Sequence, residues 1–328
     1  MCHVTRIFLN AETSMRAKTL IALASAAAAA ALLIARRSRP LARHLRWVQA
    51  AGVSHSNELQ VAIELALRCG EAMLATAGAP PTLKDGEEDG IDPVTATDTA
   101  NEALVTQTLA MRFPSHSVIG EEAAAAAGGV PPIGDGPTWI VDPIDGTQNF
   151  VHGLPMSVVS IGLARGGVPV LGVVYDPYRD ELFVGVVGEG AFLNGRRMRV
   201  DGCESLQRAM VLTDVGYERS DAGVARISSA LAAVLGANTF GVRIVGSTVL
   251  ALVWVAAGRA SAFYAGLGKR DCPKPWDWCA AHAIAIASGA SFLRLGGSDA
   301  PFDIRSNSCV CAASPQLAHR LAELLVRK

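Results

Sequence analysis

The sequence feature that most constrains the fold is the run WIVDPIDGTQNF at residues 139–150. Its first three residues are apolar and predict a buried strand, which a sharp turn would end. Asp142 and Asp145 would then lie together at the mouth of this strand. The backbone N–H groups of Gly146 and Thr147 would be free at the start of a following helix, where they attract anions.

Two carboxylates beside an anion-binding helix start would repel a phosphate group unless cations lay between them. Oxygen ligands at this spacing suit Mg²⁺, which binds proteins through one or two carboxylates and shares the phosphate oxygens of a substrate. The run therefore predicts a metal-dependent phosphate site.

The run is similar to the signature of the inositol monophosphatase family. Other segments follow in the order typical of this family, so that the resemblance extends roughly from Asn57 to the C-terminus. These segments are 92–98, 113–122, 172–175, 188–194, 246–248 and 275–277. The first ~50 residues precede the matching region, which by length forms one or two domains.

The spacing of apolar residues and the turn signals predict alternating helices and strands. Helices are expected at 57–75, from Thr97 or Asp98 toward Met111, and at 247–257, 278–288 and 314–326; strands are expected at 158–164, 168–175, 181–187, 210–213 and 243–245. Such elements in layers indicate an α/β or α+β sandwich. The resemblance sharpens this to the layered αβαβα sugar-phosphatase fold, in a catalytic domain at 51–328.

The resemblance also implies which residues would form the site. Metal ligands for two or three Mg²⁺ ions would be Glu121, Asp142, the carbonyl of Ile144, Asp145 and Asp277. Asp98 and Thr147 would take the proton of the attacking water, while Gly146, Thr147, Gly246, Ser247, Thr248 and Lys84 would bind phosphate or the rest of the substrate. Without the resemblance, purely structural roles stay open, because Glu121 also suits a helix N-terminus and Asp277 an N-cap.

The activity that the resemblance implies is a Mg²⁺-dependent, Li⁺-sensitive hydrolysis of inositol monophosphate by a homodimer. One departure concerns the family's glutamate shortly before the Trp-Asp pair, where this chain has Ala265 in a longer, basic segment, 265–275. Asp271 would replace that acid, or Lys269, Arg270 and Lys274 would meet a second phosphate.

The same chemistry on another small phosphate therefore stays open: histidinol phosphate, a sugar phosphate, fructose bisphosphate or a 3′-phosphoadenosine compound. A membrane-tethered pseudoenzyme is a remote alternative, since all the expected carboxylates are present. The formal net charge of -1 implies no broad basic surface and argues against nucleic acid as a partner. Seven cysteines without a CxxC pair indicate buried thiols in a reducing compartment.

The first 50 residues are predicted to be a targeting or membrane-anchor segment. Residues 19–35 are apolar, uncharged and flanked by basic residues. A single-pass anchor, a cleaved signal or organelle transit peptide, and an alanine-rich helix all fit this pattern. If the segment is an anchor, the basic residues after it keep the catalytic domain in the cytosol and associate it with a membrane through 19–35.

Overall fold

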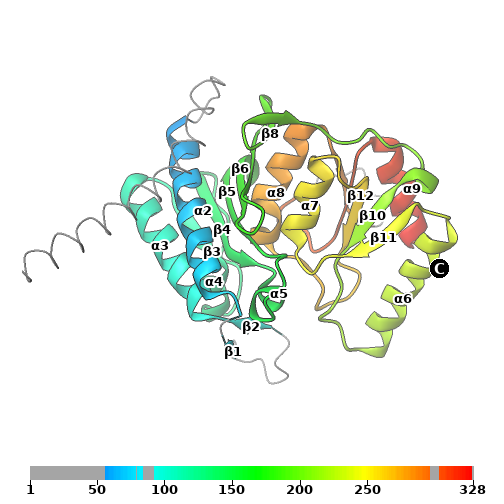
Figure 1. The fold of residues 1–328 in the computed structure, drawn as a ribbon, viewed down its shortest axis with the longest axis horizontal. Helices are drawn as coiled ribbons and strands as arrows, with labels where there is room; N and C mark the ends of the chain where they lie inside the picture. Colours follow the sequence, from blue (N-terminus) through cyan, green and yellow to red (C-terminus); the bar gives the residue numbers. More distant parts are fainter. Residues whose placement is uncertain (1–55, 79, 84–91, 296–302, 327–328) are drawn as a thin grey trace, which may run out of the picture. The chain divides into compact units, whose positions relative to one another are not determined.

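The computed structural model describes residues 56–78, 80–83, 92–295 and 303–326, all within the unit Trp47–Lys328. The predicted N-terminal segment and Lys84 lie outside these residues. In the described part, helices and two large sheets alternate in five layers (Figure 1). The prediction of an αβαβα sandwich is therefore confirmed.

The first two layers are a group of helices and a seven-stranded sheet. The helices are α2 (Ser56–Thr76), α3 (Ala96–Arg112) and α4 (Glu121–Ala126). The strand order is β3-β4-β5-β6-β7-β8-β9, where only β3 and β4 run parallel. The strands are β3 (Ser117–Gly120), β4 (Pro137–Asp145), β5 (Val158–Arg165), β6 (Val168–Asp176), β7 (Glu181–Val186), β8 (Gly190–Leu193) and β9 (Arg196–Met198).

The remaining layers are a buried helix pair, a five-stranded sheet and an outer helix pair. The middle pair is α7 (Thr248–Ala256) and α8 (Pro275–Ser288), and the outer pair is α6 (Asp221–Gly236) and α9 (Pro315–Val326). The second sheet has the order β11-β10-β12-β14-β13, with β10 (Met210–Thr213), β11 (Gly241–Ile244), β12 (Ala262–Ala265), β13 (Ser291–Leu293) and β14 (Cys309–Ala312). Because α7 and α8 are covered on both sides by sheets, they are apolar nearly all round.

Smaller elements connect these layers. A two-stranded sheet joins β1 (Thr82–Leu83) to β2 (Pro93–Val94) just before α3. The short helix α5 (Thr147–Val151) follows β4 directly, and a 3₁₀ turn at Leu206–Arg208 precedes β10. The strand–turn–helix predicted from the 139–150 run is therefore present.

The strand β4 differs from the prediction in where it ends. It continues through Pro143 to Asp145, and its pairing with β5 shifts between Asp142 and Asp145. Extra β4 residues there interrupt the regular pairing with β5, which is a β-bulge and a position where a strand tolerates proline. Residues three apart in a regular strand point to opposite faces, so the bulge is what places the two aspartates on one side.

No helix in the described ranges is both long and apolar enough to cross a membrane. The longest of them, α2 with 21 residues, carries Glu58, Glu64, Arg68 and Glu71, whereas a span needs about 20 mostly apolar residues. This finding contradicts the predicted single-pass, membrane-anchored localisation, which is corrected accordingly. Residues 19–35, on which that prediction rested, lie outside the described residues.

A row of glycines crosses the seven-stranded sheet beneath α8. Gly162 of β5 pairs with Gly172 of β6, which pairs with Gly185 of β7. A Cβ atom at Gly172 would lie 2.1 Å from the carbonyl oxygen of Ala280 in α8, so no other residue fits there without a shift. The row lets the helix backbone pack directly on the sheet and sets the position of Asp277 at the start of α8.

We expect Gly172→Ala to lower the free energy of unfolding by about 1–3 kcal/mol, because an added methyl group overpacks this contact. Denaturant unfolding measures the loss. Gly134→Ala is the control, since a Cβ atom at Gly134 meets no atom within 4 Å. Equal losses in the two variants would contradict the packing argument.

Candidate active site

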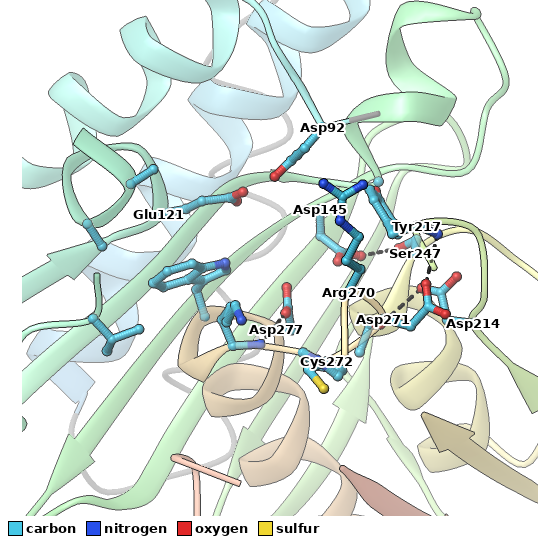
Figure 2. Close-up of a pocket in the computed structure, with 18 of the residues that line it drawn as sticks. Asp92, Glu121, Asp145, Asp214, Tyr217, Ser247, Arg270, Asp271, Cys272 and Asp277 are labelled. Carbon is cyan, nitrogen blue, oxygen red and sulfur yellow. Dashed lines mark hydrogen bonds between the residues drawn. The ribbon is translucent and has the colours of Figure 1, made fainter. Parts of the chain in front are cut away.

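An acidic pocket of about 420 Å³ opens beside the end of β4 and the starts of α4, α7 and α8. Among the charged residues of its described lining, six are acidic and two are cationic, and Figure 2 labels the six acids and Arg270. The acids are Asp92, Glu121, Asp145, Asp214, Asp271 and Asp277, and the cations are Arg270 and Lys274. A concave surface with this excess of negative charge attracts cations.

Three carboxylates lie close together at this pocket, and two of them, those of Asp145 and Asp277, belong to its lining. Asp142, Asp145 and Asp277 each offer an oxygen that lies within 4.8 Å of the others. The first two come from the β4 bulge, and the third lies in the first turn of α8. The Ile144 N–H donates to Asp142 Oδ1 at 3.0 Å, and the Lys274 N–H donates to Asp277 Oδ2 at 2.6 Å, so backbone groups orient both carboxylates.

The start of α7 holds the carboxylate of Asp145 in place. The Ser247 hydroxyl and the Val249 N–H both donate to Asp145 Oδ2, the latter at 3.1 Å. Ser247 also caps α7 by accepting from the Leu250 N–H at 3.2 Å. Next to it, the Thr248 hydroxyl donates to Asp214 Oδ2 at 3.0 Å. The side chains of Ser247 and Thr248, predicted to bind substrate, therefore bind acids of the pocket.

The predicted Asp98–Thr147 pair is brought together by α3 and α5. The Thr147 hydroxyl lies 3.4 Å from Asp98 Oδ1 and 3.0 Å from the Ile144 carbonyl oxygen. Asp98 Oδ2 accepts from the N–H of Thr95 at 2.8 Å and from its hydroxyl at 2.5 Å. Asp98 thus caps its own helix with one oxygen and directs the other toward Thr147.

The other predicted site residues divide between the pocket and its surroundings. Glu121 is the first residue of α4 and points into the pocket, although it is not part of the 4.8 Å carboxylate group (Figure 2). Gly146 and Gly246 also line the pocket. Lys84 lies outside the described residues.

Burial and mutual repulsion make several of these acids hard to ionise. Burial raises the pKa of Asp98 to about 6 and that of Asp145 to about 7, with neighbouring acids adding to both shifts. Burial, followed by the charges of Asp145 and Glu121, raises the pKa of Asp277 well above its ordinary value. Burial also raises the pKa of Asp214 to about 6. A bound cation would relieve this repulsion and favour the ionised forms.

The wall opposite the carboxylate group is built from two loops whose contacts the sequence did not predict. Asp271 Oδ1 accepts from the N–H groups of Gly216, Tyr217 and Glu218, at 3.2, 2.8 and 3.2 Å. In return, Glu218 Oε2 accepts from the Lys269 N–H at 2.7 Å. One oxygen of Asp271 is thereby bound to this loop, while the residue also lines the pocket, so its predicted replacement of the family's acid stays a prediction.

Two further residues, Ala265 and Asp214, differ from expectation. Ala265 belongs to β12, is 2% exposed and packs in the apolar core, so its side chain does not face the pocket. Asp214, which the sequence analysis did not select, follows β10 and lines the pocket. Its sequence signal is an acid directly after a predicted strand, which is also the signal of the 139–150 run.

Residues 55–328 match the model of the Inositol monophosphatase family. The chain belongs to this family. A relative named Inositol monophosphatase 1, from Solanum lycopersicum, is 41% identical over 272 residues, which cover 81% of this chain and 94% of the relative. Inositol monophosphatase 2 of Homo sapiens is 39% identical over 267 residues, which cover 81% and 89%.

Solved structures of inositol monophosphatases and related proteins share the fold. The crystal structure of the extragenic suppressor protein suhB from Bartonella henselae has a TM-score of 0.70 and 28% identity, and the match covers 83% of this chain and 99% of that one. An inositol monophosphatase from Anabaena gives a TM-score of 0.67 and 28% identity, with 83% and 96% covered.

The raised pKa values of Asp145 and Asp277 make stability depend on pH, and would make the binding of a cation to these acids depend on pH as well. Between the ordinary pKa of an aspartate and the raised folded values, the metal-free native state holds protons that the unfolded chain has lost. The contribution of these two aspartates to the stability of the metal-free protein is therefore most favourable at low pH. This contribution is lost as the pH rises toward about 7. A divalent cation must displace these protons, so it binds better at the higher pH.

We accordingly expect saturating MgCl₂, compared with EDTA, to raise the unfolding temperature more at about pH 8 than at about pH 5. Thermal unfolding followed by circular dichroism measures the difference. The exposed Asp135→Asn variant should retain it, and Asp145→Asn should lose most of it. An equal Mg²⁺ effect at both pH values would contradict the assignment of the carboxylate group as a cation site.

Proposed function

We propose that this protein is a metal-dependent phosphomonoesterase that hydrolyses inositol monophosphate to inositol and phosphate. The single observation that carries the proposal is the carboxylate group of Asp142, Asp145 and Asp277, two of which line the pocket, in a chain from this family. The names of the relatives, which cover most of this chain, support the substrate. We assign the catalytic domain to residues 51–328, which the family match from residue 55 supports.

The donor set fits a hard divalent cation. Three mostly buried carboxylates with oxygens within 4.8 Å of each other repel one another unless protons or a cation lie between them. We assign Mg²⁺ ligands to these three aspartates, to Glu121 and to the Ile144 carbonyl, for two or three ions. When bound, the ions would neutralise charge on the phosphoryl oxygens and acidify the attacking water.

The proton of that water would pass to the Asp98–Thr147 pair. The Thr147 hydroxyl lies 3.4 Å from Asp98 Oδ1 and can donate to it while accepting from water. Burial raises the pKa of Asp98 to about 6, so this carboxylate is mostly ionised near neutral pH and is well matched to accept a proton. Thr95 holds the other oxygen and keeps the pair in place.

Phosphate and alcohol would bind on different sides of the pocket. The N–H groups of Gly146 and Thr147 at the start of α5 would bind phosphate oxygens, and residues 246–248 would contact the alcohol. Arg270 and Lys274 favour a second candidate, a small phosphate ester with another anionic group, because both line the pocket. We also infer a homodimer from the family.

Phosphate release from a panel of small phosphomonoesters tests the function. We expect inositol monophosphate to be hydrolysed with Mg²⁺ and not with EDTA, and LiCl to inhibit more than KCl at equal ionic strength. Faster hydrolysis of a bisphosphate or sugar phosphate would favour the second candidate. No Mg²⁺-dependent release from any compound would refute both.

Asp142→Asn should lower kcat by at least ~10³-fold, because the substitution removes a charge from the centre of the cation site. Its fold should persist, since asparagine keeps the oxygen that accepts from the Ile144 N–H. Circular dichroism checks the fold, and Asp135→Asn serves as the exposed acid control. Near-normal turnover in folded Asp142→Asn protein would refute the assignment of Asp142 to the cation site.

A further inference from the structure

The helix α3 carries a second buried carboxylate one turn after Asp98. Glu102 is 6% exposed and has no part in the proposed chemistry. Its Oε2 accepts from the Glu122 N–H at 2.7 Å, and its Oε1 accepts from the Ala123 N–H at 2.8 Å. Both oxygens thus bind the first turn of α4.

This contact replaces a cap that α4 lacks. The N-cap residue of α4 is Gly120, which has no side chain to accept from the first N–H groups of the helix. A Cβ atom at position 120 would lie 2.3 Å from Cδ of Glu102, so glycine is what allows the carboxylate to approach. The helix has only six residues, and a negatively charged cap at its N-terminus stabilises it.

The capped turn begins with Glu121, which points into the pocket (Figure 2). A carboxylate that accepts two parallel N–H bonds fixes both the position and the rotation of the groups it binds. Because the two bonds go to the two residues directly after Glu121, they determine where the backbone of Glu121 lies. The same helix α3 holds Asp98 beside Thr147, so one rigid element sets both positions.

We propose that Glu102 is a positioning residue that places Glu121 for cation binding from behind the pocket. The inference rests on the proposed function, because it takes Glu121 as one of the cation ligands. It assigns Glu102 a role beyond satisfying buried N–H groups. Loss of its two hydrogen bonds to the first turn of α4 lets this helix shift, which weakens cation affinity even where the chain stays folded. Groups that orient metal ligands typically contribute this way.

The test compares Mg²⁺ binding to full-length variants by isothermal titration calorimetry. Glu102→Gln keeps the size of the side chain but turns an NH₂ donor toward one of the two N–H groups, so we expect the Kd for Mg²⁺ to rise about tenfold or more. Activity should recover at high Mg²⁺, which gives a nearly normal kcat with a raised Mg²⁺ requirement.

Two further variants keep the test decisive if Glu102→Gln folds poorly. Gly120→Ala leaves Glu102 in the chain but pushes it away from α4, and the backbone φ of -111° at this position suits alanine. It should raise the Kd in the same way. Leu109→Ala is the matched control, because it opens a cavity at a fully buried position of the same helix. It should lower the unfolding temperature without changing the Kd.

The outcomes separate this inference from the proposed function. A wild-type protein that neither binds Mg²⁺ nor releases phosphate refutes the proposed function. A wild-type protein that does both, with unchanged Mg²⁺ Kd in Glu102→Gln and Gly120→Ala, overturns the role of Glu102 alone. An equal rise of the Kd in Leu109→Ala would also overturn it, since the effect would then follow general stability.

Discussion

Repulsion among acids gathered in one pocket is the constraint on which the rest of this structure depends. Asp142, Asp145 and Asp277 lie close together, and Glu121 and Asp214 line the pocket together with the last two. The raised pKa values of Asp145, Asp214 and Asp277 express the free-energy cost of keeping such groups charged and dehydrated. A fold that keeps this cluster must surround it with donors and with positive potential.

Helix N-termini supply both the hydrogen-bond donors and the positive potential. The helices α3, α4, α5, α7 and α8 each carry one residue proposed for the site in the first turn or directly before it: Asp98, Glu121, Thr147, Ser247 and Asp277. The N-terminus of a helix offers unpaired N–H groups and the positive end of its dipole. The contacts to Asp145 from Val249 and to Asp277 from Lys274 are of this kind. The layered arrangement allows these helix starts to lie near one another. Helices on the two sides of the seven-stranded sheet can start close together only where that sheet ends.

Only one part of the site could be predicted from local chemistry, where its residues are neighbours in sequence. The 139–150 run carries two aspartates and a helix start within a few positions, which predicts a cation and phosphate site there, whereas the roles of Asp98, Glu121 and Asp277 followed only from the family resemblance. The end of β4 was predicted wrongly, since a proline usually stops a strand and the bulge depends on pairing with β5. Likewise, the roles of Asp271 and Glu102 depend on backbone groups of distant segments, 216–218 and 122–123, which no local pattern reveals.

Elements of the second sheet were also missed for a physical reason. The strands β12 and β14 are four-residue apolar runs buried on both faces, and such runs show no alternation that would distinguish them from helix. The position of Ala265 was mistaken for the same reason, because β12 was not predicted as a strand. Its side chain packs in the core, although its place in the sequence suggested the pocket.

The two sides of the pocket are therefore held in place by different contacts. The carboxylate group is fixed by helix starts and by the bulge of β4, whereas the opposite wall consists of two loops bound to each other through Asp271 and Glu218. These loops carry Tyr217 and Arg270 to the pocket (Figure 2). Because backbone N–H groups and not the carboxylate cluster hold the loops, side chains on them can change without disturbing the acids. A difference in substrate among relatives would accordingly arise in the loops, while the cation site keeps its geometry.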